Sequence, residues 1–312
     1  MIYIIGTGPM ALAYAKVLVH LDKEFTVIGR GKASAETFYS AIGVQPITGG
    51  IEKYLENGKF CKQDNIIIAT GTETLMSTLK KVLLAGAGSV LVEKPAAISI
   101  EELIENEEFL KLYQENVFVA YNRRFYASVI EAIKLIEEDG GLESMHFEFT
   151  EWAHKIEPLD KAPGVKENWF FANSTHVIDL AFFIAGKPKD WKAYSQKGKL
   201  DWHPVTKFVG AGITDKNVLF SYNSNWESAG RWGIELMTFK RKIILKPLEE
   251  VQFQIKGTID AEKFTFDESL DQNFKPGLFN QLQAFLNFEK TNLISLKMHI
   301  ENSKYIYKKI IS

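Results

Sequence analysis

Short apolar segments alternate with helical segments through the first third of the chain. The apolar segments occupy residues 2–5, 25–28, 66–69, 89–92 and 117–121. Helical spacing of apolar positions covers 9–21 and 74–85 between them. Strands without polar alternation are typical of a parallel sheet that is covered on both faces. The pattern therefore predicts a doubly wound α/β domain over residues 1–121.

The pattern changes after Tyr121. A helix is predicted over 128–138, and strand-like segments follow at 145–149, 206–213, 217–222, 234–239, 243–245 and 251–255. Hairpin-sized gaps such as 214–216 join consecutive segments, so the second α/β domain, residues 122–312, is expected to hold an open, mainly antiparallel sheet. Two further helices are predicted over 278–288 and 295–310.

Composition and charge narrow the class of protein. Of the 312 residues, 46% are hydrophobic and 24% are charged, which is the balance of a globular protein. The net charge of −2 gives no electrostatic reason to expect nucleic acid as a partner. The single Cys61 excludes a disulfide framework and a cysteine-based zinc site, and no metal is predicted. No apolar run approaches a membrane span and no signal peptide is visible, so we expect a cytoplasmic protein without a membrane partner.

A glycine-rich turn follows the first strand. The residues Gly6, Thr7, Gly8, Pro9, Met10 and Ala11 match the pattern G-x-G-x-x-G/A between a strand and a helix. Gly6 allows a tight turn, Gly8 lets a pyrophosphate approach the backbone, and the helix N-terminus supplies amide donors. An incidental glycine turn is the alternative, but the strand–turn–helix context favours dinucleotide binding.

The second strand ends without the carboxylate that usually binds the adenosine ribose. The residues after it are Gly29, Arg30, Gly31 and Lys32. Without that acid a 2′-phosphate is not repelled, and Arg30 and Lys32 can pair with it. These cations could also be solvated loop residues. We expect NADP(H) in preference to NAD(H).

A third feature, Glu93-Lys94-Pro95, follows the predicted strand at 89–92. Ligands of open parallel sheets bind beyond the carboxyl ends of the strands, which places Lys94 toward the expected nicotinamide region. Pro95 restricts Lys94 to extended backbone. Alone, such a tripeptide is more often a surface turn.

Four segments occur in an order and spacing that resembles the glucose–fructose oxidoreductase/inositol dehydrogenase/MocA (Gfo/Idh/MocA) family. They are the glycine motif, Ile66-Ile67-Ile68-Ala69-Thr70, Glu93-Lys94-Pro95 and Tyr121-Asn122-Arg123-Arg124-Phe125. The resemblance covers essentially the whole chain. It implies a nicotinamide-dependent oxidoreductase of a sugar, cyclitol or related polyol, a homo-oligomer (dimer or tetramer), and a catalytic Lys94 beside the reacting oxygen. The further cofactor-binding residues that it implies are Ala69, Thr70, Gly71, Glu93, Lys94 and Asn122.

The same resemblance points to a functional histidine in the second domain. The family usually has Asp-x-x-x-His there; this chain has His176, with Ala172 at the position of the Asp. Asn173, Ser174 and Thr175 are N-cap types, which predicts a helix start that exposes His176 to a cleft, and Asp179 could share its face. A structural histidine is the alternative. The expected catalytic pair is Lys94 and His176, and the expected substrate contacts are Lys94, Arg123, Trp169, Asn173 and His176.

Several residues could form a substrate wall, although a core or interface role is the more common one for each. They are Trp152, His154, Trp169, Asn223, Trp226, Arg231 and Trp232. Two departures from the family pattern, Gly71 and Leu75, concern the loop over the cofactor. Two other functions stay open: a nucleotide-binding regulatory protein without turnover, favoured by Ala172, and a reductase of a non-carbohydrate carbonyl or imine.

Overall fold

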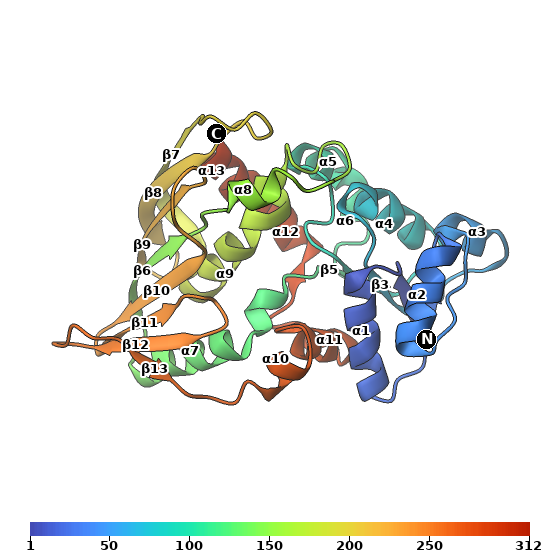
Figure 1. Ribbon diagram of the computed structural model, residues 1–312, viewed down its shortest axis with the longest axis horizontal. Coiled ribbons are helices and arrows are strands. Elements are labelled where there is room, and N and C mark those ends of the chain that lie inside the picture. The colour runs from blue at the N-terminus through green and yellow to red at the C-terminus, as the bar shows by residue number, and fades with distance from the viewer. The chain divides into compact units, whose positions relative to one another are not determined.

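The computed structural model describes all 312 residues and divides the chain into two units. Unit 1 contains Met1–Tyr121 and Asn273–Asn302, and unit 2 contains Asn122–Gln272 and Ser303–Ser312. This division differs from the sequence expectation in one segment, because 273–302 returns to the first unit (Figure 1). The cause is long-range pairing and packing that no local pattern contains.

Unit 1 is built on a six-stranded sheet in the order β14-β5-β4-β3-β1-β2. Its strands are β1 (Ile2–Ile5), β2 (Phe25–Ile28), β3 (Asn65–Ile68), β4 (Ser89–Val92), β5 (Val117–Val119) and β14 (Ile294–Ser295). The first five are parallel, and β14 pairs antiparallel with β5. The predicted doubly wound sheet is confirmed. Its strand order reverses between β1 and β3, which is where such sheets bind ligands.

Helices surround this sheet. They are α1 (Pro9–His20), α2 (Lys32–Ile42), α3 (Gly50–Asn57), α4 (Leu75–Leu84), α5 (Ile100–Glu105), α6 (Glu107–Lys111), α11 (Leu278–Leu286) and α12 (Leu296–Asn302), with a 3-10 turn η1 (Thr72–Thr74) before α4. All four residues of β4 are buried, as expected of a strand covered on both faces. The late helix α11 packs against the first helix α1, which ties the returning segment to unit 1.

Unit 2 is built on an eight-stranded sheet in the order β13-β12-β11-β10-β6-β9-β8-β7. Its strands are β6 (Leu142–Glu148), β7 (Pro188–Gln196), β8 (Lys207–Thr214), β9 (Leu219–Asn225), β10 (Gly233–Thr238), β11 (Arg241–Leu245), β12 (Val251–Ile255) and β13 (Glu262–Phe264). Only β6 and β9 pair in parallel. The expected open, mainly antiparallel sheet is therefore confirmed.

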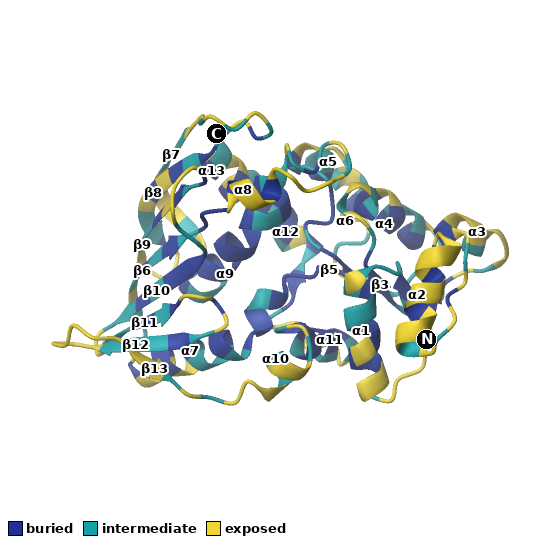
Figure 2. Cartoon of the chain, in the orientation of Figure 1, coloured by how far each residue is buried: buried dark blue, intermediate teal, exposed yellow.

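Aromatic side chains and three helices form the core of unit 2. The helices α7 (Ala127–Glu138), α9 (Thr175–Ala185) and α13 (Lys308–Ile311) contact the sheet, and α9 is buried almost throughout (Figure 2). The ring of Phe147 stacks on Tyr222 at 5.2 Å and meets Phe182 on α9 edge-on at 5.6 Å. These ring contacts fix α9, and with it His176, on the sheet.

The predicted helix over 295–310 is confirmed: α12 ends at Asn302, a π turn η4 (Ser303–Tyr307) continues the helical backbone, and α13 completes it. The chain passes from unit 1 to unit 2 between Asn302 and Ser303. Strand β7 was missed because most of its exposed positions are polar and it begins with a proline. Both features help an edge strand to avoid pairing with other chains.

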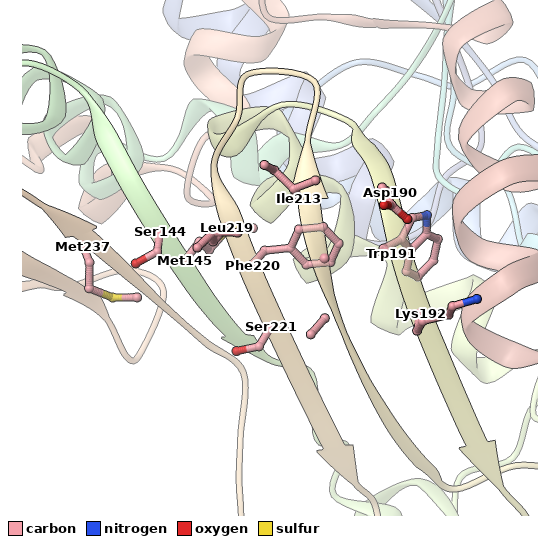
Figure 3. Close-up of a pocket in the computed structure, with 12 residues that line it drawn as sticks. Ser144, Met145, Asp190, Trp191, Lys192, Ile213, Leu219, Phe220, Ser221 and Met237 are labelled. Carbon is pink, nitrogen blue, oxygen red and sulfur yellow. The ribbon is translucent and has the colours of Figure 1, made fainter.

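The sheet of unit 2 carries a hollow of about 720 Å³ along β6 to β9 (Figure 3). Its lining includes Asp190, Trp191, Phe220 and Met237, and none of the expected site residues belongs to it.

No helix of the chain has the length and apolar character needed to cross a membrane. No group of three or more His, Cys, Asp or Glu side chains is arranged to hold a metal ion.

Candidate active site

The turn between β1 and α1 has the geometry that the glycine motif predicts. Gly6 has φ of +125°, and a Cβ there would lie 2.3 Å from the carbonyl oxygen of Ala69 at the end of β3. Gly8 has φ of −81°, and a Cβ there would meet no atom within 4 Å. Gly6 is therefore required by the fold of unit 1, whereas Gly8 faces open space that a ligand can enter.

A pocket of about 460 Å³ lies at the carboxyl ends of β1 and β3. Nine of the expected cofactor residues line it: Gly6, Thr7, Gly8, Pro9, Met10, Arg30, Ala69, Thr70 and Gly71. Residues that the sequence did not single out complete the lining, among them Ser34, Glu52, Glu73, Ser77 and Thr78. The pocket sits at the switch point of the sheet, where doubly wound folds bind nucleotides.

The residues of this pocket fit a dinucleotide. No side chain caps the N-terminus of α1, and its first turn holds no acidic residue, so its amide groups remain available to a phosphate. The hydroxyl of Thr70 is buried in the lining without a hydrogen-bond partner. Buried polar atoms normally have a partner, and a bound ligand would supply one here.

The rim beside β2 carries both signs of charge. Arg30 and Ser34 line the pocket, and Ser34 accepts a hydrogen bond from Thr7 at 3.0 Å. The carboxylate of Glu52 is bound by Lys81, and this hydrogen bond is the main cause of a lowered pKa for Glu52. Lys32 begins α2 on the exposed side and does not line the pocket. Arg30 is therefore the cation placed at this end of the pocket.

Glu93 and Lys94 follow β4 but do not line the pocket. The Tyr14 hydroxyl donates a hydrogen bond of 2.8 Å to Glu93, and lies 3.4 Å from the Gln281 side-chain oxygen. Burial raises the pKa of Glu93, and burial together with Glu93 raises the pKa of Tyr14 well above its usual range. Glu93 thus anchors the end of β4 to α1, and the adjacent Lys94 is partly buried.

The start of helix α9 differs from the sequence expectation. A π turn η3 (Phe170–Ser174) leads directly into α9, so Asn173 and Ser174 are already helical and cap nothing. The Thr175 hydroxyl donates to the carbonyl of Phe171 at 2.8 Å. His176 is buried, with 5% of its surface exposed, rather than open to a cleft. Because η3 and α9 form one continuous helical segment, no helix begins at the cap residues Asn173 to Thr175, as their sequence had predicted.

Asn173 and Ser174 instead bind a carboxylate that sequence reasoning missed. The Glu151 side chain accepts hydrogen bonds from Asn173 at 3.1 Å and from Ser174 at 2.8 Å, and lies 3.6 Å from Arg231. Burial raises the pKa of Glu151, opposed by these neighbours and by Trp169. Its place three residues after the end of β6, next to Trp152, was the available signal.

The segment η2 (Asn122–Phe125) is anchored to α9. Arg124 forms two hydrogen bonds to Asp179, at 2.7 and 2.6 Å, and both side chains are buried. Asp179 is thereby engaged by Arg124. This bidentate pair fixes the position of Arg123, whose guanidinium lies 4.7 Å from the Trp232 ring. The His176 ring is 6.1 Å from Trp232.

The remaining residues that the sequence singled out lie in several different places. Arg231 and Trp152 join Trp232 near Glu151, because Arg231 stacks on both rings at 4.6 Å. Trp226 is buried against Trp202 and His203, so the core role is its observed one. His154 and Asn223 are exposed, Asn122 is buried in unit 2, and Leu75 is buried in unit 1.

The fold and the pocket define a protein with a dinucleotide-binding Rossmann unit and an α/β unit with an open sheet. Residues 1–121 match the Gfo/Idh/MocA oxidoreductase family model, described as an NAD-binding Rossmann fold. These residues therefore match the NAD-binding domain of that oxidoreductase family, and the resemblance drawn from the motifs is confirmed. No curated protein sequence matches the chain.

Solved structures share the fold over nearly the whole chain. An oxidoreductase from Thermotoga maritima has a TM-score of 0.74 at 18% identity, and one from Desulfitobacterium hafniense, named as NADPH-dependent, has 0.75 at 13%. Levoglucosan dehydrogenase, solved with NADH and L-sorbose, has 0.73 at 17%. Each likeness covers 99% of this chain and 95% of the other. At these identities the likeness is one of fold.

Proposed function

We propose that the protein is an NADP(H)-dependent oxidoreductase that acts on a sugar or sugar derivative. The observation that carries the proposal is the pocket at the switch point of unit 1, with its glycine turn, uncapped helix and unpartnered Thr70 hydroxyl. When bound there, the nicotinamide would exchange hydride with a carbinol or carbonyl carbon of the substrate. Levoglucosan dehydrogenase supports a carbohydrate substrate by likeness of fold.

Arg30 supports the preference for the 2′-phosphorylated cofactor. It is the cation in the lining beyond β2, and the carboxylate of Glu52 on the same rim is bound by Lys81. A guanidinium can make a charge-assisted hydrogen bond to a phosphate. Such a bond contributes about 1.5–3 kcal/mol, or roughly one to two decades in affinity.

The proposed catalytic residues are Lys94 and His176. An ammonium group at Lys94 would stabilise negative charge that develops on the substrate oxygen during hydride transfer, and would hold or release the hydroxyl proton. His176 would act as a second acid/base or orient the substrate. We further propose that Glu151 holds the start of α9 through Asn173 and Ser174, so that a carboxylate supports this helix although Ala172 supplies none.

Titration of NADPH and NADH against the purified protein tests the cofactor proposal. We expect tighter binding of NADPH, and loss of that preference in Arg30→Ala. Lys23→Ala, which removes an exposed cation before β2 and outside the pocket, is the matched control and should bind both cofactors as the parent does. Tighter binding of NADH, or an unchanged preference in Arg30→Ala, would refute the role of Arg30.

A regulatory protein that binds the nucleotide without turnover is the second candidate, and the alanine at position 172 favours it. The two candidates differ in one measurement. Steady consumption of NADPH with a panel of keto-sugars supports the oxidoreductase. Tight NADPH binding, without consumption in that panel, favours the regulatory protein.

The oligomeric state, expected to be a dimer or tetramer, is measured by light scattering on the same preparation.

A further inference from the structure

Arg123 is a cation without an anionic partner. Its guanidinium stacks on Trp232 at 4.7 Å and lies 5.8 Å from the Tyr126 ring, but its side chain forms no ion pair and its Nε is buried without a hydrogen bond. Burial lowers the pKa of Arg123, which marks the environment as unfavourable for its charge. Arg123 as a whole is half-buried, but its Nε is enclosed. A buried donor in a protein normally has an acceptor, so this one calls for a partner.

A second arginine lies on the same indole ring. Arg231 stacks on Trp232 and on Trp152 at 4.6 Å each, and its side chain is 40% exposed. The charge of Arg231 further lowers the pKa of Arg123, so the two cations disfavour each other. The Nε1 of Trp232 is a second buried donor without a partner, beside the Nε of Arg123. The cluster therefore gathers donors and positive charge on one aromatic platform.

The nearby carboxylates leave the Nε of Arg123 and the Nε1 of Trp232 without an acceptor. Glu151 accepts three hydrogen bonds from Asn173 and Ser174, forms an ion pair with Arg231 at 3.6 Å, and raises the pKa of Arg123. Glu249 raises the pKa of Arg123 from a distance but is exposed and forms no ion pair with it. Stacking alone would explain two arginines on a tryptophan, but it leaves the Nε of Arg123 without the acceptor that its burial calls for.

We propose that Arg123 and Arg231 bind an oxyanion group of the substrate, a carboxylate or a phosphate, so that the substrate is an anionic sugar derivative. Guanidinium groups match the planar or tetrahedral oxygens of such groups and bind them through paired donors. The His176 ring, 6.1 Å from Trp232, places the proposed acid/base beside the same platform. The inference rests on the proposed function and adds the charge class of its substrate.

Binding of small probes to the full-length protein tests the proposal. The probes are D-glucuronate, D-glucose 6-phosphate, inorganic phosphate and, as the neutral reference, D-glucose, followed by calorimetry and by tryptophan fluorescence. We expect at least one anionic probe to bind ten-fold or more tightly than D-glucose. Arg123→Gln and Arg231→Gln should each weaken that binding about ten-fold or more and leave D-glucose unaffected.

Two further variants separate binding from structure. Lys216→Gln removes an exposed cation from the β8–β9 turn and should leave anion binding unchanged. Arg123→Lys keeps the charge but loses the planar fork, so it should bind the anion with intermediate affinity; it also serves if Arg123→Gln does not fold. The ratio of the glucuronate to the glucose 6-phosphate affinity identifies the group as carboxylate or phosphate.

The outcomes also separate this inference from the proposed function. If every anionic probe binds no better than D-glucose, or binds Arg231→Gln as tightly as the parent, the anion site is wrong, whatever NADPH does. If the anions bind as expected but neither NADPH nor NADP⁺ binds, the oxidoreductase proposal fails and the anion site stands.

Discussion

Alanine at Gly6 and at Gly8 should damage the protein in different ways, although the two glycines are two residues apart. At Gly6, φ of +125° is strained for any other residue, at a cost of about 1–3 kcal/mol. The new Cβ would also lie 2.3 Å from the Ala69 carbonyl oxygen, and overpacking of this kind costs about 1–3 kcal/mol more. Gly6→Ala should therefore lose roughly 2–6 kcal/mol of unfolding free energy.

Gly8→Ala meets no such obstacle. Its φ of −81° suits any residue, and no atom lies within 4 Å of the new Cβ. The weaker N-cap and the smaller chain entropy of the unfolded state nearly offset each other, so stability should change by less than about 1 kcal/mol. The methyl group would occupy space that a pyrophosphate needs, and loss of a charged hydrogen bond weakens binding by about one to two decades.

Urea unfolding followed by circular dichroism measures the first effect, and titration with NADPH measures the second. The parent protein is the reference in both assays. The reasoning is refuted if Gly6→Ala unfolds at the same urea concentration as the parent. It is also refuted if Gly8→Ala binds NADPH as tightly as the parent.

Three other predictions follow from the site and its supports. Lys94→Ala should lower kcat by about two decades or more, with NADPH affinity near the parent value. His176→Ala should raise KM as well as lower kcat. A single-turnover rate for Lys94→Ala equal to the parent's would exclude a catalytic role for Lys94. Asp179→Asn should lose about 3–5 kcal/mol in urea unfolding, because it removes the carboxylate charge that binds the buried Arg124 through two hydrogen bonds; a loss under 1 kcal/mol would show that the pair contributes little. Burial lowers the pKa of His203 from 6.5 to about 4. The stability that its neutral form contributes is present above pH 6.5 and is lost as the pH falls toward 4, by about 3 kcal/mol in all. The unfolding free energies of the parent and of His203→Gln should therefore converge as the pH falls. Parallel dependence of the two on pH from 7 to 4 would contradict this.

Local patterns predicted the parts of the fold that depend on nearby residues. Apolar runs without polar alternation marked the strands β1, β2 and β4, since a strand covered on both faces needs no alternating polar positions. The glycine motif predicted the turn after β1 because a positive φ at Gly6 is a property of the backbone itself. Arg30 could be proposed from the sequence as a cofactor contact because it lies in the short turn after the end of β2.

Other site features depend on residues far apart in the chain. Glu151 reached Asn173 and Ser174, 22 and 23 positions away, only when β6 and α9 packed together. Asp179 was expected beside His176 on one helix face, but Arg124 engages it from 55 positions away. Glu52 and Ser34 line the nucleotide pocket from helices that the apolar pattern missed.

The sequence by itself determined the doubly wound sheet of unit 1, the glycine turn and the kind of ligand that this turn can hold, because each follows from local backbone geometry and apolar periodicity. Only the tertiary structure decided that residues 273–302 return to unit 1, where β14 pairs with β5 and α11 packs on α1. It also decided that two arginines meet on Trp232, 108 residues apart at Arg123 and Arg231. Contacts of that kind depend on which buried faces meet, and no local pattern records that choice.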